Sequence, residues 1–359
     1  MTVEIELSKK SFSEQKRLIA RQGVIEAFGF RYASGIEALE IHNGAGTAVL
    51  LPFRGQQIWD VVFNGRRLTM QTIFDEPVNA SNFHRSYGAF FVHCGATATG
   101  YPGPEDDHEL HGELPYISYE RAAIVFGSDA KGEYVELTGL VRDRKFFGPS
   151  FAFRPALRLH ANATAFDLTV EVENLGGGTM PLMYLAHANF RPVDGSRLVD
   201  TLMPDPDRRW QVPAYLAGAD DTLVSWHREV EADFNRHRTI KAGDRIEKEF
   251  GFSDAYHADM DGWAHAMQIL PNGSADFISF RPRELRRGSR WLSRAPDRQA
   301  LGICLPSTAR PLGRKRTEEN GNLLFLASGQ RFRASLSFGA VDAQGAADLQ
   351  ARIITATSA

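Results

Sequence analysis

Strict alternation of apolar and polar residues recurs along this chain and constrains its fold more than any other feature. The clearest case is FDLTVEVEN (166–174), in which apolar and polar residues take turns up to the closing asparagine. The segments YVELTGLV (134–141) and ALRLHA (156–161) carry the same signal, and so does the stretch from Phe332 to Phe338. A period of two places the apolar side chains on one face of a β-strand. The chain is therefore predicted to be mostly β, with strands buried on one face.

Turn signals separate these segments. Asn64-Gly65, Asn272-Gly273 and Ser328-Gly329 are typical of tight turns between strands, and the chain has 32 glycines among 359 residues. The long central region has no regular alternation of strands with helices, which argues against a doubly wound parallel sheet. We expect one large antiparallel β-sandwich.

Residues 13–28 are the exception to the period of two. Charged residues there alternate with Leu18, Ile19 and Val24 at helical spacing, which predicts a short N-terminal helix. The expected organisation is an N-terminal extension with this helix at 1–35, a β-sandwich domain at 36–345 and a C-terminal tail at 346–359.

Composition and charge exclude several classes of partner. Lys and Arg number 41 against 44 Asp and Glu, so no electrostatic field favours nucleic acid or an anionic membrane. No apolar run approaches the roughly 18 to 20 residues of a membrane span, and the first residues lack the pattern of a secretory signal. We expect a cytoplasmic protein, with Cys94 and Cys304 as buried, unreactive thiols. The sequence predicts no oligomeric state.

The densest polar cluster lies in HCGATATGYPGPEDDHELHGELPY (93–116). Its glycines and prolines predict a loop, and loops often carry catalytic groups. The cluster contains His93, His108, His111 and Glu113. Imidazoles with a carboxylate suit zinc, manganese or iron, so these four residues are the candidate ligands of a divalent metal. Their spacing matches no closed metal signature, and we expect no cofactor.

Two other segments carry candidate functional groups. His187 lies in the otherwise apolar YLAHANFRP (184–192), where a satisfied core histidine is the alternative. Asp259 and Asp261 lie in YHADMDGWAHA (256–266), where they could simply shape a turn around Gly262. The phosphate-binding, dinucleotide-binding, G-x-S-x-G and HExxH motifs are absent from the sequence.

The order of several short segments along the chain resembles the aldose 1-epimerase (galactose mutarotase-like) superfamily, in a divergent bacterial branch. The segments that carry the resemblance are GTAVLLPFRGQQIWDVVFNGRRL (46–68), LHGELPY (110–116), YLAHANFRP (184–192), MDGWAHAMQILPNGSADFISFRPRELRRGSRW (260–291) and GNLLFLASGQRFRASLSFG (321–339). The resemblance implies a large single-domain supersandwich of antiparallel sheets. That expectation agrees with the strand pattern.

The resemblance also implies an activity, the opening and closing of a sugar ring. In the family a carboxylate removes the proton of the anomeric hydroxyl while a histidine protonates the ring oxygen. His111 matches the family's first histidine and His187 the second, which is the general acid. Asp259 or Asp261 matches the hydroxyl-binding aspartate, and Trp291 is the candidate platform for the sugar's C–H face. The implied partner is a small sugar or sugar derivative.

The chain departs from the family at two positions. The general-base glutamate is expected in GICLPSTARP (302–311), where Leu305 or Pro306 stands instead. The family's arginine is also unmatched, and the nearest position holds His93, which becomes a candidate substrate-binding residue. Removing a general base costs a factor of about 10² to 10⁴ in rate.

Three explanations of the missing glutamate stay open. In the first, Glu113 supplies the base beside His111, and the protein is a sugar isomerase. In the second, His93, His111 and His187 with an acidic residue catalyse another proton transfer, as an epimerase or lyase on a keto-sugar, with or without a metal. In the third, the protein is a non-catalytic sugar-binding module.

The basic run RPRELRRGSR (281–290) allows a further expectation about the substrate. Such runs are commonly solvated faces. The alternative is that Arg283, Arg286 or Arg287 binds the acidic group of a charged sugar, because the guanidinium fork matches carboxylates and phosphates.

Overall fold

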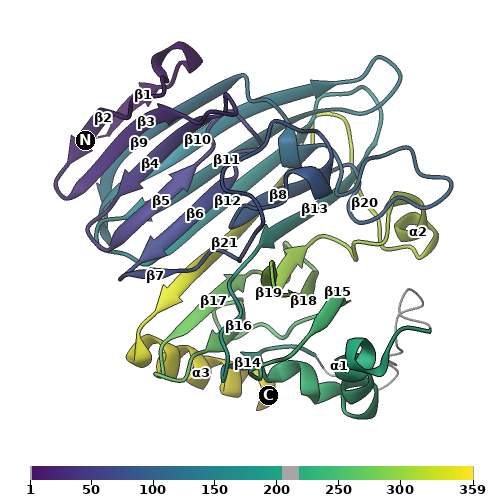
Figure 1. The fold of residues 1–359 in the computed structure, drawn as a ribbon. Helices are drawn as coiled ribbons and strands as arrows, with labels where there is room; N and C mark the ends of the chain where they lie inside the picture. The colour runs from purple at the N-terminus through teal and green to yellow at the C-terminus, as the bar shows by residue number, and fades with distance from the viewer. Residues whose placement is uncertain (1, 204–217, 359) are drawn as a thin grey trace.

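The fold is built on two antiparallel sheets that stack face to face (Figure 1). A computed structural model describes residues 2–203 and 218–358. The first sheet has nine strands, in the order β1 (Val3–Glu6), β9 (Arg121–Asp129), β10 (Gly132–Arg144), β11 (Ser150–His160), β12 (Ala165–Asn174), β21 (Arg331–Val341), β17 (Ala275–Phe280), β16 (Ala264–Ile269) and β14 (Arg197–Asp200). The predicted mostly β sandwich is confirmed.

The second sheet has twelve strands and carries the site described below. Its main path is β15 (Ile246–Asp254), β18 (Arg287–Arg294), β19 (Gln299–Ser307), β13 (Met180–Ala188), β8 (Phe91–Ala96), β6 (Ile58–Phe63), β5 (Gly46–Leu50), β4 (Glu37–His42), β3 (Ile25–Arg31) and β2 (Arg17–Gln22). Two short strands complete it, with β7 (Arg66–Arg67) paired to β6 and β20 (Leu324–Leu326) paired to β13.

Phenylalanine side chains fill the space between the two sheets. Phe91 of β8 stacks on Phe338 of β21 with ring centroids 4.9 Å apart, and Phe63 of β6 meets Phe166 of β12 at 5.7 Å. All four side chains are almost fully buried. The alternation in 166–174 and 332–338 therefore arises because β12 and β21 each turn one face to this core and the other to solvent.

The predicted N-terminal helix at 13–28 is wrong. Residues 17–31 form the hairpin of β2 and β3, which turns at Gly23 with a φ of 52°. Ile25 and Ala27 are fully buried, whereas Glu26 between them is not, which is the period of a strand. Pairing of β3 with β4 decides the conformation, because it supplies backbone partners that a surface helix would not have.

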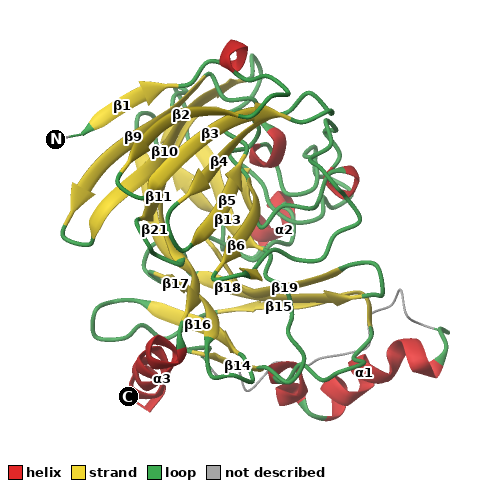
Figure 2. Ribbon diagram, turned by 60° about the vertical axis from the view of Figure 1, so that its left-hand side comes forward, coloured by secondary structure: helices red, strands yellow, loops and turns green. Residues whose placement is uncertain are grey.

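The α-helices lie at the periphery of the sheets, as Figure 2 shows. They are α1 (Asp221–Ala232), α2 (Arg314–Glu319) and α3 (Ala343–Ser358), and the described 3₁₀ turns are η1 (Lys9–Ser11), η2 (Phe83–Arg85), η3 (Leu114–Tyr116) and η5 (Phe234–Arg238). The expected C-terminal tail is thus helical, and α3 packs its buried Ile353 beside β14, β16 and β21. None of the described helices is long and apolar enough to cross a membrane.

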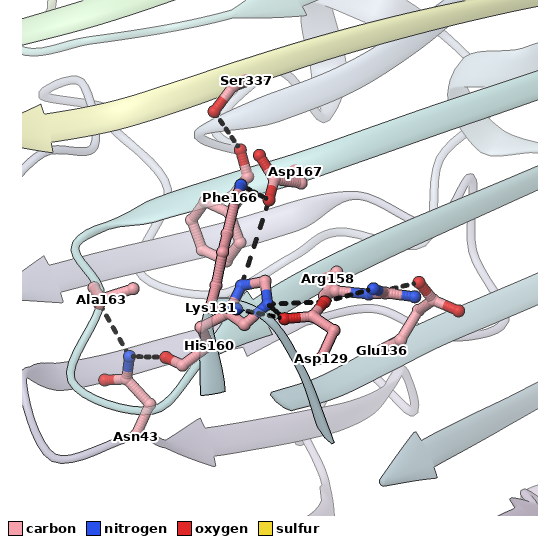
Figure 3. Close-up of polar contacts among 10 residues, drawn as sticks. All are labelled: Asn43, Asp129, Lys131, Glu136, Arg158, His160, Ala163, Phe166, Asp167 and Ser337. Atoms are coloured by element: carbon pink, nitrogen blue, oxygen red, sulfur yellow. Dashed lines mark hydrogen bonds and ion pairs between the residues drawn. The ribbon is translucent and has the colours of Figure 1, made fainter. Parts of the chain in front are cut away.

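Buried polar contacts join the two sheets at two places. Asn43, between β4 and β5, donates hydrogen bonds to the carbonyl of His160 (2.9 Å) at the end of β11 and to that of Ala163 (2.7 Å) in the turn to β12 (Figure 3). Elsewhere, Asp200 at the end of β14 accepts from Arg290 of β18 at 2.6 Å, with both side chains almost fully buried. These contacts link one sheet to the other.

Candidate functional site

A cavity of about 800 Å³ opens on the face of the twelve-stranded sheet that points away from the first sheet. On β13, Ala186 and Ala188 belong to the core between the sheets. Because side chains alternate along a strand, Leu185 and His187 face the opposite side of the sheet. The lining residues come from segments far apart in the sequence: Met70, Gln71, Thr72, Ile73, Phe74, Phe83, His84, Tyr87, Tyr101, Leu110, His111, His187, Lys248, Glu249, Trp291, Ser293, Arg298, Gln299 and Ala300. The volume is sufficient for a small sugar.

His111 and His187 lie side by side in this cavity. Their ring centroids are 5.4 Å apart and their planes are nearly perpendicular, at 86°. Burial lowers the pKa of His187 to about 4, although a hydrogen bond with Asn189 acts in the opposite direction. Burial, with a smaller contribution from His187, holds the pKa of His111 well below its usual value. Both imidazoles are therefore neutral at pH 7.

The backbone places His111 through an unusual local conformation. His111 has a φ of 64° and Gly112 a φ of 76°, so two successive residues are left-handed. A Cβ at Gly112 would lie 2.3 Å from the carbonyl oxygen of Ala98, so only glycine fits there. The His111 Nδ1 accepts a hydrogen bond from the amide of Gly100 at 3.4 Å.

The other face of His187 is held by a tyrosine and an asparagine. The Tyr87 hydroxyl lies 3.4 Å from His187 Nδ1 and donates a hydrogen bond to Asn189 Oδ1 at 2.5 Å. Asn189 Nδ2 in turn donates to the carbonyl of Ala89 at 2.9 Å. Burial raises the pKa of Tyr87 well above its usual value, so the phenol keeps its proton. Tyr87 was not predicted from the sequence, because an aromatic residue in a loop is commonly a packing residue.

Trp291 forms an aromatic wall of the cavity, as the resemblance implies. Its ring centroid is 5.6 Å from that of His187 and 6.0 Å from that of Tyr87. Its indole Nε1 donates to Glu249 Oε2 at 2.7 Å, which fixes the plane of the ring. Glu249 is the only carboxylate among the lining residues that the structure describes. It was not predicted, because only the pairing of β15 with β18 brings it beside Trp291.

A third histidine, His84, lies at the mouth of the cavity. Its Nε2 is 3.4 Å from the hydroxyl of Tyr101 in an exposed contact. Gln71, Ser293, Arg298 and Gln299 add polar groups to the wall. These side chains can donate to or accept from the hydroxyls of a polyol, and the aromatic residues can cover its C–H face.

The structure places Glu113 outside the cavity. Although it follows His111 by two residues, the left-handed turn at 111–112 sends its side chain away from the imidazole. Its carboxylate accepts from the backbone amide of Thr97 at 3.1 Å and from the Thr97 hydroxyl, and it pairs with Lys145 at 3.3 Å. Glu113 is therefore not available to a substrate beside His111.

His93 also lies outside the cavity, within the core between the sheets. Its Nδ1 is 2.8 Å from the Tyr184 hydroxyl, and the rings of Phe91 and Phe153 pack on it at about 5 Å. Burial lowers the pKa of His93 to about 3. His93 is thus a neutral, buried core histidine, and the substrate contact expected for it is not present.

The aspartates and the arginine predicted to bind substrate do not line the cavity either. Asp259 accepts from His265 Nε2 at 2.8 Å and, together with Asp261, pairs with Arg352 of α3. Both aspartates therefore hold the C-terminal helix against the sheet. The Arg283 side chain is 74% exposed and lies 3.6 Å from Glu284, on a solvated face.

The proposed metal ligands are dispersed. His108 accepts from the amide of Arg314 at 3.4 Å and lies 3.5 Å from Asp106, whereas His93 lies in the core between the sheets and His111 lines the cavity. Within residues 2–203 and 218–358, no three His, Cys, Asp or Glu side chains gather in a geometry that could hold a metal ion.

Leu305 is one of the two residues, with Pro306, at which the family resemblance predicts a glutamate. It is 3% exposed and packs with Leu185 and Cys94 in an apolar cluster that also contacts Trp291. Leu305 is therefore part of a hydrophobic support under the aromatic wall. Cys94 and Cys304 are both fully buried free thiols, as predicted, and burial raises the pKa of each.

Comparison with known proteins agrees with this architecture. A family model described as a domain of unknown function, DUF4432, matches residues 33–340. The chain belongs to the DUF4432 family. No curated protein matches it in sequence.

Solved structures show the same fold across the whole chain. A candidate aldose 1-epimerase from Klebsiella pneumoniae superposes with a TM-score of 0.82 at 16% identity, covering 99% of this chain and 96% of that one. A galactose mutarotase-like protein from Clostridium acetobutylicum gives 0.58 at 12% identity, covering 88% and 98%. The galactose 1-epimerase of Lactobacillus acidophilus gives 0.53 at 11% identity, covering 95% and 98%. This DUF4432 chain thus has the galactose mutarotase-like fold.

Proposed function

We propose that this protein is a carbohydrate isomerase that interconverts the anomers of an aldose or aldose derivative. The observation that carries the proposal is the pair of neutral imidazoles, His111 and His187, brought from two distant segments into one cavity beside Trp291. Ring opening needs one group that takes a proton from the anomeric hydroxyl and one that assists the ring oxygen. Two imidazoles about 5 Å apart can reach both oxygens of one anomeric centre.

The aromatic wall supports a sugar as the ligand. Trp291 presents a flat apolar face, and its hydrogen bond to Glu249 fixes that face in place. The polar side chains of Gln71, Ser293 and Gln299 stand around the same space. This combination of a platform with dispersed hydrogen-bonding groups fits a polyol better than an extended apolar ligand.

The test is the rate of anomer interconversion. Freshly dissolved α-anomers of neutral aldoses and of uronic acids are followed by polarimetry and by exchange NMR, with and without the enzyme. We expect acceleration of at least one aldose, and a loss of about 10²-fold or more in His187→Gln. His42→Gln, whose side chain pairs with Glu40 on β4 outside the cavity, is the matched control and should keep the rate.

Two outcomes would replace the proposal. Saturable sugar binding without acceleration of any aldose would identify a sugar-binding module. Turnover that is abolished by EDTA and restored by a divalent metal would identify a metal-dependent proton transfer instead.

A further inference from the structure

The hydrogen bonds around Tyr87 determine which nitrogen of His187 carries the proton. Asn189 Nδ2 donates to the carbonyl of Ala89, so the amide oxygen of Asn189 must be the group that faces Tyr87. Because that oxygen can only accept, the Tyr87 hydroxyl proton is committed to it. Towards His187 the tyrosine oxygen then has only lone pairs to offer.

His187 is consequently protonated on Nδ1. A neutral imidazole carries one proton, and the Nδ1 edge faces acceptors only, the oxygens of Tyr87 and Asn189. The opposite edge, with Nε2, then presents a lone pair to the cavity that His187 lines. In this state His187 can accept a proton from a ligand and cannot donate one through Nε2.

His111 has the complementary arrangement. Its Nδ1 accepts a hydrogen bond from the backbone amide of Gly100, and a backbone N–H is always a donor. The proton of the neutral His111 ring therefore lies on Nε2, the edge opposite Gly100. The cavity thus receives an N–H donor from His111 and a lone pair from His187, on rings 5.4 Å apart.

We infer that His187 is the general base of the reaction and His111 the hydrogen-bond donor to the ring oxygen. This inference rests on the proposed function and reverses the role that the family resemblance implies for His187. It also accounts for Leu305, because a site whose histidine already accepts the proton has no need of a carboxylate at that position.

The proton balance closes with these two side chains alone. His187 Nε2 takes the proton of the anomeric hydroxyl, the electron pair of that O–H bond forms the C1=O1 double bond, and the C1–O5 bond breaks. The electron pair left on O5 is stabilised by His111 Nε2–H, as neutral imidazoles do for developing oxyanions. O5 then takes the proton from the His187 imidazolium. Rotation about C1–C2 and the reverse steps give the other anomer and return both histidines to their neutral forms.

Titratable and charged groups from several elements line the cavity together with His187. They are Tyr87 before β8, His84 on η2, Tyr101 and His111 between β8 and η3, Lys248 and Glu249 of β15, and Arg298 before β19. Burial keeps the Tyr87 phenol and the Cys94 thiol protonated near pH 7. With its pKa lowered to about 4, His187 is in its basic form throughout the neutral range.

The first test reads the tautomers directly, without substrate. Long-range ¹H–¹⁵N correlation spectra of protein labelled at histidine distinguish protonated from unprotonated ring nitrogens, and His187→Gln and His111→Gln assign the two signals. We expect the proton on Nδ1 of His187 and on Nε2 of His111. The opposite tautomer at His187 would overturn the inference whatever the activity.

The second test is the pH dependence of kcat/KM. A base of pKa about 4 must be deprotonated, so kcat/KM should rise with pH through about 4 and stay level at neutral pH. If His187 acted as the acid, kcat/KM would instead fall as the pH rises through that value. The rise of kcat/KM near pH 4 should persist in Glu249→Gln. If the rise disappears in that variant, Glu249 is the base.

Paired substitutions at residue 111 separate a donor from a base. His111→Ala removes the N–H and should lower kcat by about 10² to 10³. His111→Gln carries the same left-handed backbone strain but keeps an amide donor, and we expect it to regain about tenfold or more of that loss. His187→Gln has no basic nitrogen and should remain down by about 10² to 10⁴. Equal rates for the two variants at 111 would contradict a donor role.

The two proposals fail in different ways. Absence of turnover for every aldose removes the proposed function and the role assignment together, even with the expected tautomers. Turnover with the opposite tautomers, or with a kcat/KM that falls as the pH rises through about 4, refutes the role assignment alone.

Discussion

The buried ion pair between Asp200 and Arg290 predicts a large loss of stability in Asp200→Asn. The pair connects β14 at the edge of the nine-stranded sheet with β18 in the twelve-stranded sheet. Arg290 also donates to the carbonyl of Ile303 at 2.7 Å, and Asp200 accepts a second guanidinium, that of Arg238, at 3.0 Å. The substitution keeps the volume of the side chain and removes only its charge.

The expected magnitude follows from the burial of both partners. The side chains of Arg290 and Asp200 are 1% and 0% exposed, so water cannot solvate the guanidinium once its counter-charge is removed. Breaking a buried pair in this way costs about 3 to 5 kcal/mol. With an unfolding entropy of about 0.75 kcal/mol/K, from 2.1 cal/mol/K for each of 359 residues, the midpoint should fall by about 4 to 7 °C.

The assay is urea and thermal unfolding at pH 7, followed by circular dichroism. The control is Glu6→Gln, which breaks the exposed pair of Glu6 and Arg121, at 61% and 57% side-chain exposure, and should cost less than about 1 kcal/mol. If Asp200→Asn costs no more than the control, the two sheets are not held by this pair, and the reasoning fails.

Four further predictions follow, three for the site and its supports and one for the contact that holds the C-terminal helix. Trp291→Ala should weaken sugar binding, measured by titration calorimetry, while Trp263→Ala, outside the cavity, should not. Leu305→Glu should not raise kcat and should lower stability by several kcal/mol, because it buries a carboxylate in an apolar cluster; a gain in rate would show that the position is still catalytic. Gly112→Ala should reduce both soluble yield and activity, since its Cβ would meet a carbonyl oxygen at 2.3 Å. Hydrogen bonds from His265, Trp263 and Arg352 outweigh burial and lower the pKa of Asp259 from 3.8 to about 2. Its contribution to stability is therefore present above pH 4 and lost as the pH falls towards 2, so unfolding curves of Asp259→Asn and the unaltered protein should converge at pH 2 and separate at pH 7.

The sheets could be predicted from the sequence wherever a strand has one buried and one solvated face. The segment 166–174 is such a strand, and its alternation survives in the burial of Phe166, Leu168 and Val170. The hairpin at 17–31 could not be predicted in the same way. Leu18 and Val24 are about half exposed, so their spacing carried no information about a buried face. The strand conformation of 17–31 is decided by the pairing of β3 with β4, which the side-chain pattern of 17–31 does not reveal.

The site could be predicted only where a residue's chemistry is unusual for its surroundings. His187 stands out because it is polar within an apolar strand, and the resemblance placed it and His111 together. Glu113 was a wrong candidate for the base. It follows His111 by two residues, but the left-handed backbone at 111 and 112 turns its side chain away from the imidazole. Glu249 and Tyr87 are ordinary residues in their segments. Their position depends on strand pairing and on the path of the loop before β8, which no local pattern records.

The left-handed backbone of His111 has a consequence for how this site could change during evolution or design. Besides glycine, the residues that tolerate a φ near 64° best are asparagine, aspartate and histidine. Asparagine and aspartate are each reached from a histidine codon by a single base change. The loop can therefore exchange an imidazole for an amide or a carboxylate without rebuilding its backbone. Residue 111 is thus the place where this fold can most readily acquire a different acid–base chemistry.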